Sequence, residues 1–239
     1  MATSRSTGPR AEAARGNGPP LSGPRPEAAR ENGPPLSGRR AEAARNDDRI
    51  LQAAREVFVA DPEAPIAEVA KRAGVGISAL YRRYPSKEDL LRTLCADGLQ
   101  RYIATVEAAL ADAGDPWEAF ANFMRRAVET DSTSLTLHLA GRFTPTEDLY
   151  AAANHAQELN QRLFERTRAA GAVRPDLDVN DLSLILEQIA SLHLGDERRT
   201  QAIRQRHLAL ALDGLRTPEP AELPAPPPTW DEIAGRWQA

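Results

Sequence analysis

The sequence has one cysteine, few aromatic residues and no long apolar run. The single cysteine, Cys95, excludes an internal disulfide and any multi-cysteine metal site. No stretch approaches the ~18 consecutive apolar residues of a membrane-spanning helix, and the N-terminus lacks the apolar segment of a secretory signal. Aromatic residues make up only 5% of the 239 residues, so aliphatic side chains and alanine must fill the core. We therefore expect a cytoplasmic protein that has no membrane segment, metal or cofactor.

Motifs that are typical of enzymes are also missing. None of the four histidines follows a glutamate by three residues, so the E-x-x-H pattern of di-iron helical bundles is absent. The patterns G-x-x-x-x-G-K-[ST], G-x-S-x-G and H-E-x-x-H do not occur either. Cys95 lies on an apolar helix face, which favours burial over a nucleophilic role. We expect no catalytic residues.

Charge is unevenly distributed along the chain. Residues 1–92 carry 16 basic and 12 acidic side chains, whereas the remainder carries 14 and 22. A basic N-terminal part on an acidic body is typical of a protein whose N-terminal end binds nucleic acid. Ordinary variation in surface charge would give the same division.

Residues 1–45 are predicted to form a disordered tail. Thirteen of the first forty residues are proline or glycine, and a 15-residue unit repeats from residues 8–22 to 23–37, with a partial third copy from Gly38. The period is too short and too rich in proline for a solenoid. Two interpretations stay open: a tandem duplication tolerated in an unfolded tail, or an arginine-bearing arm that attracts DNA phosphates.

From residue 46 onward the apolar periodicity is helical, which predicts an all-α fold. We expect an N-terminal domain over 46–92, a helical body over 93–217, and a Pro-rich linker with a short C-terminal helix over 218–239. Thr144 and Glu147 have the spacing of a capping box with Pro145 at the first helical position. The expected helices span 46–60, 65–73, 77–84, 86–112, 115–130, one short helix within 132–143, 145–170, 180–194, 196–215 and a few residues after Thr229.

Residues 66–84, IAEVAKRAGVGISALYRRY, have the pattern of a helix-turn-helix. We expect Ile77 and Leu80 to anchor its second helix on a three-helix core. Short side chains allow that helix to enter a major groove, and arginine donates two hydrogen bonds to guanine. A solvated helical hairpin would show the same spacing. The expected outer face of the second helix comprises Ser78, Ala79, Tyr81, Arg82 and Arg83.

Residues 50–91 also contain four short motifs. They read Ile50-Leu51-x-Ala-Ala-x-x-x-Phe58, Val69-Ala70-x-x-Ala73-Gly74-Val75, Leu80-Tyr81-x-x-Tyr84 and Ser86-Lys87-Glu88-x-Leu90. Together they resemble the N-terminal domain of TetR-type bacterial transcriptional regulators. The resemblance implies a three-helix helix-turn-helix domain joined to a helical ligand-binding and dimerisation domain. Pro65 replaces the family's usual threonine, and Gly76 and Ala79 replace its usual serine and threonine, so hydroxyl groups that would contact DNA are missing.

The resemblance further implies which residues meet double-stranded DNA. Some would approach base edges, others would hold phosphates, and arginines preceding the first helix would form an arm into the minor groove. The base-facing residues are Ile77, Ser78, Ala79, Tyr81 and Arg82; the phosphate-holding residues are Arg83, Tyr84 and Lys87; and the arm comprises Arg39, Arg40 and Arg45.

In the body, the helices over 180–194 and 196–215 resemble the family's dimerisation pair, although an internal bundle within a monomer would look the same. Their apolar positions are Leu182, Ile185, Leu186, Ile189, Leu192, Ile203, Leu208, Ala211 and Leu215. By the same resemblance, the helices over 86–112, 115–130 and 145–170 would enclose a cavity for an apolar or amphipathic small molecule. The candidate lining residues, each of which would equally suit a plain core, are Leu99, Ile103, Trp117, Phe120, Phe123, Met124, His138, Phe143, Tyr150 and Asn154.

The sequence thus predicts a homodimeric DNA-binding regulator, with repression as the family's usual mode. A small-molecule ligand would release it from a palindromic operator whose half-sites lie one helical turn, ~34–36 Å, apart. The alternative is a helical scaffold or protein-interaction module that docks partners through its C-terminal tail and reads no DNA.

Overall fold

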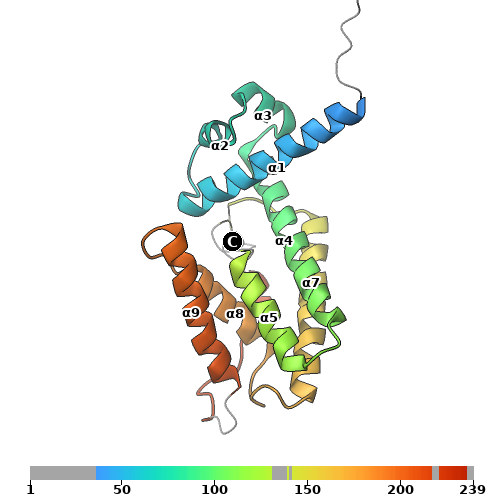
Figure 1. Ribbon diagram of the computed structural model, residues 1–239, viewed down its shortest axis with the longest axis vertical. Coiled ribbons are helices and arrows are strands. Elements are labelled where there is room, and N and C mark those ends of the chain that lie inside the picture. The colour runs from blue at the N-terminus through green and yellow to red at the C-terminus, as the bar shows by residue number, and fades with distance from the viewer. Residues whose placement is uncertain (1–35, 131–138, 140–141, 217–220, 236–239) are drawn as a thin grey trace, which may run out of the picture.

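A computed structural model describes residues 36–130, 139, 142–216 and 221–235. These residues form helices and no strand, which confirms the predicted all-α fold. Figure 1 shows α1 to α3 at one end of the molecule and the remaining helices in a bundle at the other. The helices are α1 (Leu36–Ala60), α2 (Ile66–Ala73), α3 (Ile77–Arg83), α4 (Lys87–Ala111), α5 (Pro116–Glu129), α7 (Glu147–Ala169), α8 (Val179–Ala190), α9 (Glu197–Leu215) and α10 (Trp230–Gly235).

The N-terminal helices bury a core of their own. The apolar face of α2, which the spacing predicts, is confirmed as buried, and the fully buried Leu80 is the contribution of α3. Short helices of seven and eight residues are marginal alone, so this packing holds them in place. The core includes Ile50, Ala54, Phe58, Ile66, Val69, Ala70, Ala73, Leu80, Leu90, Leu91 and Leu94.

The 25-residue helix α4 takes part in both halves of the molecule. Its first turns contribute Leu90 and Leu94 to the N-terminal core. Further along, Ile103 and Val106 enter a second core, which α4 shares with α5, α7, α8 and α9. In Figure 1, α4 runs from the N-terminal helices into the bundle. A single rigid element therefore joins the two parts.

Two helix boundaries differ from the expected ones by four residues or more. Helix α1 begins at Leu36, so residues 36–45 are helical and are not part of a disordered tail. The AEAAR segment of the third repeat consists of strong helix formers and extends α1 toward the N-terminus. Residues 1–35, with the first repeat and most of the second, lie outside the described residues, as do residues 132–138, 140 and 141 of the expected short helix. Helix α8 ends at Ala190, four residues before the expected 194.

The starts of α4 and α5 follow the expected signals, whereas the start of α7 does not. Ser86 and Asp115 accept hydrogen bonds from backbone N–H groups at the starts of α4 and α5, as predicted. The predicted cap of α7 is wrong, because Thr146 accepts from the N–H of Leu149 in place of Thr144. The backbone of Thr144 instead bonds to α4, through the carboxylate of Glu88 and the guanidinium of Arg92.

The described helices include none that is long and apolar enough to cross a membrane.

Candidate DNA-binding surface and ligand cavity

The turn between α2 and α3 is fixed by a contact from α1. Gly74 ends α2 in the left-handed conformation, with φ of 67°. Arg49 Nη2 donates a hydrogen bond to the carbonyl of Ala73 at 2.7 Å. A Cβ atom at Gly74 would lie 3.2 Å from the same Nη2 atom, so both conformation and space favour glycine here. The angle between the two short helices is thereby tied to α1.

Helix α3 meets the core through Leu80 and Tyr84, one turn apart. The prediction that Ile77 anchors the helix is wrong, since its side chain is 40% exposed. With only seven residues, α3 leaves its first turn beyond the edge of the core. Tyr81 is 46% exposed on the same helix. We call the outward residues of α3 the recognition surface: Ile77, Ser78, Ala79, Tyr81 and Arg82.

Three further residues expected at DNA are held within the domain. Arg83 forms a two-pronged ion pair with Asp47 of α1, at 2.8 Å and 2.6 Å, and this carboxylate raises the pKa of Arg83. Lys87 Nζ donates to the carbonyl of Pro62 at 2.9 Å and lies over the ring of Phe58. Tyr84 is only 5% exposed, and burial raises its pKa.

The remaining cations of this region differ in their environment. Arg82 is exposed, and no hydrogen bond joins its guanidinium to any residue that the structure describes. Arg45 is exposed on α1. The side chains of Arg39 and Arg40 lie outside the described residues. Arg82 is therefore the arginine of α3 that is available for an external partner.

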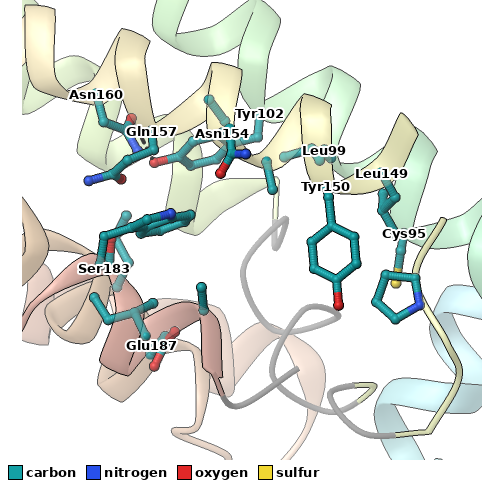
Figure 2. Close-up of a pocket in the computed structure, with 17 residues that line it drawn as sticks. Cys95, Leu99, Tyr102, Leu149, Tyr150, Asn154, Gln157, Asn160, Ser183 and Glu187 are labelled. Carbon is teal, nitrogen blue, oxygen red and sulfur yellow. Dashed lines mark hydrogen bonds between the residues drawn. The ribbon is translucent and has the colours of Figure 1, made fainter. Parts of the chain in front are cut away.

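A cavity of about 190 Å³ lies between α4, α7, α8 and α10. Leu99, Tyr150 and Asn154, three of the predicted lining residues, do line it. In Figure 2, Asn154 and Gln157 of α7 lie on one side and Ser183 and Glu187 of α8 on the other. Among the residues that the structure describes, the lining comprises Cys95, Leu99, Tyr102, Pro145, Leu149, Tyr150, Ala153, Asn154, Ala156, Gln157, Asn160, Ser183, Leu186, Glu187, Trp230, Ile233 and Ala234.

Most other predicted lining residues belong to the cores. Helix α5 packs its apolar face against α4 and α9 and contributes nothing to the cavity; for example, Phe123 meets Tyr102 edge-on at 5.7 Å. Phe143 lies in the N-terminal core, and His138 is outside the described residues. The residues misassigned to the cavity but found in the core of the body are Ile103, Trp117, Phe120, Phe123 and Met124.

Apart from Asn154, sequence reasoning missed the polar side of the cavity. Tyr102 Oη donates to Asn160 Oδ1 at 3.0 Å, and Gln157 Nε2 donates to Asn180 Oδ1 at 2.9 Å. The signal was present as three amide side chains spaced by three residues on α7, at 154, 157 and 160. Burial raises the pKa of Cys95 to about 12, so this cavity thiol stays protonated at neutral pH, as its apolar position suggested.

The predicted dimer face is only partly at the surface. Five of its residues are buried in the core of their own chain, because α8 and α9 pack on each other and on α5. They are Leu182, Leu186, Ile189, Leu208 and Leu215. Ile185, Leu192, Ile203 and Ala211 keep partial exposure. Leu194 and Leu210, which the sequence did not single out, are 55% and 58% exposed.

Family models match both parts of the chain. Residues 50–94 match the model described as bacterial regulatory proteins, tetR family, and residues 115–217 match the C-terminal domain of SbtR-like transcriptional regulators. The transcriptional repressor LfrR of Mycolicibacterium smegmatis is 35% identical over 82 residues. That match spans 34% of this chain and 41% of the length of the repressor.

Solved structures resemble this chain over 72–75% of its length. A TetR regulatory protein from Mycobacterium vanbaalenii is 31% identical with a TM-score of 0.51, and the match covers 74% of this chain and 99% of that one. The regulator SCO0520 from Streptomyces coelicolor is 29% identical, with a TM-score of 0.52 and coverage of 72% and 99%. LfrR from Mycobacterium smegmatis, solved in complex with proflavine, shares the fold at 21% identity, a TM-score of 0.59 and coverage of 75% and 99%.

The helix-turn-helix with an exposed second helix, carried on a helical body, defines a DNA-binding transcriptional regulator and not an enzyme. The chain belongs to the TetR family of these regulators.

Proposed function

We propose that the protein is a dimeric repressor that a small molecule releases from a palindromic operator. The observation that carries this proposal is the course of α4. The helix begins at Lys87, four residues after the end of α3, and the same helix lines the cavity with Cys95, Leu99 and Tyr102. A molecule in the cavity therefore touches a helix whose first turns pack in the same core as Leu80 of α3.

The recognition surface is the proposed base-reading element. Its small residues Ser78 and Ala79 allow the helix to lie deep in a major groove, and Arg82 reaches a base edge or an adjacent phosphate. Arg83 and Lys87 contribute positive charge toward phosphates while their internal bonds fix them in place. Tyr84 positions α3 from within the core, and Arg45 extends the basic surface along α1.

The exposed apolar residues of α8 and α9 are the proposed partner contacts in a dimer. Ile203 and Leu210 lie on the outer side of α9, and Leu194 follows α8. Two subunits joined there would present two copies of α3 to successive major grooves. Ligand release requires that the occupant favour one subunit arrangement over the other, typically by ~1–3 kcal/mol.

The test begins with selection of a random double-stranded DNA pool on the purified protein. We expect an enriched palindrome, whose spacing reports the distance between the two recognition helices. The variant Arg82→Ala should weaken binding by ~1–3 kcal/mol and relax preference at one position of each half-site. An unenriched pool contradicts the proposal and favours a scaffold role.

The second part of the test asks whether a small molecule releases the protein from DNA that contains the enriched palindrome. Proflavine, which is bound in the solved LfrR structure, is the first candidate because the cavity offers both aromatic and polar groups. Titration of proflavine into the protein–DNA complex should release the DNA, as measured by fluorescence anisotropy of labelled DNA. A DNA-free control separates binding to the protein from intercalation into DNA.

A further inference from the structure

The cavity is completed by a segment beyond the region that matches the family models. That region ends at residue 217, whereas Trp230, Ile233 and Ala234 of α10 line the cavity. These three residues line the cavity together with residues of α4, α7 and α8. Helix α10 therefore supplies part of the lining of the cavity.

The position of α10 is fixed by several contacts. Arg174 Nη2 donates to the carbonyl of Ala221 at 2.6 Å, which ties the start of the described C-terminal segment to the body. Thr229 and Glu232 form a capping box at the start of the helix. Ile233 is only 6% exposed. The six-residue helix α10 is thus held by the buried side chain of Ile233 and, through the segment that precedes it, by the hydrogen bond from Arg174.

Aromatic residues are distributed in a way that points to the occupant. All five phenylalanines are buried at 7% exposure or less. By contrast, two of the four tyrosines and one of the three tryptophans line the cavity, from α4, α7 and α10. In a chain with so few aromatic residues, three rings that each carry a hydrogen-bonding atom meet at one site. Such rings favour stacking against a flat apolar partner.

The polar groups of the cavity favour an uncharged or cationic partner. The amides of Asn154, Gln157 and Asn160 offer donors and acceptors along α7. Of the described lining residues, Glu187 is the one with a formal charge, and it is negative. An anion placed here would meet a carboxylate with no cationic side chain among those lining residues, which is unfavourable away from water.

We propose that α10 is an integral wall of the ligand site, and that the site takes a compact planar aromatic molecule that stacks on Trp230, bears a hydrogen-bonding group and has no negative charge. The volume of about 190 Å³ is below the ~300–1,000 Å³ of drug-sized pockets, so we expect a small molecule of two to three fused rings. This inference rests on the proposed function only in taking the cavity as the effector site.

The experiment measures binding of 2-naphthol and of naphthalene-2-sulfonate to the full chain by calorimetry. The two probes share a ring system, but only the sulfonate is anionic at neutral pH. We expect 2-naphthol to bind at least about tenfold more tightly than the sulfonate. Trp230→Ala should lower the affinity for 2-naphthol about tenfold, whereas Trp230→Phe should retain most of that affinity because it keeps an aromatic ring.

Two further variants distinguish loss of the α10 lining from a general loss of folding. Ile233→Asp should detach α10 from the body and lower the affinity for 2-naphthol as much as Trp230→Ala does. Asp231→Ala changes an exposed residue of the same helix that is not among the lining residues of the cavity. This variant should therefore bind 2-naphthol as tightly as the unchanged protein does. Circular dichroism and the melting temperature verify that each variant is folded.

Failure to bind 2-naphthol, or equal binding by the Trp230→Ala variant, overturns the inference. Equal binding of the sulfonate overturns its charge preference. If 2-naphthol binds through Trp230 but leaves operator affinity unchanged, the wall is supported and the release mechanism is contradicted. DNA selection on the same protein tests the regulator independently of all these outcomes.

Discussion

The helices of the two parts of the molecule begin in different ways. In the helix-turn-helix, α2 follows Pro65 and α3 follows Gly76, and neither residue supplies a side-chain cap. In the body, five helices begin at a residue whose side chain accepts a backbone N–H: Asp115, Thr146, Asp178, Asp196 and Thr229. Helix α4, which both parts share, begins in the same way at Ser86. Such caps contribute ~0.5–2 kcal/mol each. Helices of the body carry local start signals, whereas α2 and α3 depend on packing.

The largest expected effect comes from removing a core ring in each part. Phe58 of the N-terminal core and Phe164 of the body are 0% and 1% exposed. Each change to alanine should cost ~3–5 kcal/mol. Because α2 and α3 rely on packing, Phe58→Ala should expose their amides to hydrogen exchange while α8 and α9 stay protected. Phe164→Ala should do the reverse, as measured by exchange with mass spectrometry.

The same exchange data contain the outcome that would break the comparison. If either change raised exchange equally in α2, α3, α8 and α9, the two cores would unfold as one unit through the shared helix α4. The conclusion that the two cores unfold separately, each with its own free energy, would then be wrong.

A buried arginine gives the next largest effect. Arg204 of α9 is 1% exposed and donates through Nε to the carbonyl of Leu192 at 3.1 Å and through Nη2 to that of Ala190. It thus satisfies carbonyl groups at and just beyond the end of α8. Arg204→Met should lower the free energy of unfolding by ~1–3 kcal/mol, because those carbonyls lose their donor. Arg206→Met changes an exposed residue of the same helix and is the matched control. Its free energy of unfolding should stay within ~0.5 kcal/mol of that of the unchanged protein.

Arg204 also illustrates what the sequence does and does not predict. Burial of Val69, Ala70 and Leu80 follows from a pattern contained within a few residues, so it was predicted. A buried arginine gives no such signal, because its partners are carbonyl groups of another helix. The exposure of Ile77 was missed for a similar reason, since periodicity does not show where the core ends.

The cavity was harder to predict than the recognition surface. Tyr102 and Asn160 meet across 58 residues of sequence, and Trp230 arrives from beyond a Pro-rich linker. An apolar position such as Phe120 or Leu99 looks the same whether it faces a core or a cavity. Only the packing of the helices against one another decides between them, so three predicted lining residues were found in the cavity and most others were found in the cores.

A smaller effect is expected from a cap in the body. Asp178 accepts from the N–H of Asn180 at 2.9 Å, and the carboxylate of Asp181 accepts from the N–H of Asp178 at 2.9 Å. Asp178→Ala should cost about 1 kcal/mol in urea unfolding, because the first turn of α8 loses its acceptor. No measurable loss would mean that packing alone fixes α8, as it does α2 and α3.

The smallest effect, and the sharpest for the comparison, is expected when a cap is added to α3. Gly76 has φ of −67°, and a Cβ atom there would meet nothing within 4 Å, so serine fits without strain. Gly76→Ser should stabilise the protein by only ~0.5 kcal/mol in urea unfolding, because serine exceeds glycine as a cap by a few tenths. Gly76→Ala is the control that restricts the unfolded chain equally but adds no hydroxyl. A gain well above ~2 kcal/mol for serine over alanine, more than an ordinary cap contributes, would show that the missing cap limits α3 and would contradict its dependence on packing through Leu80.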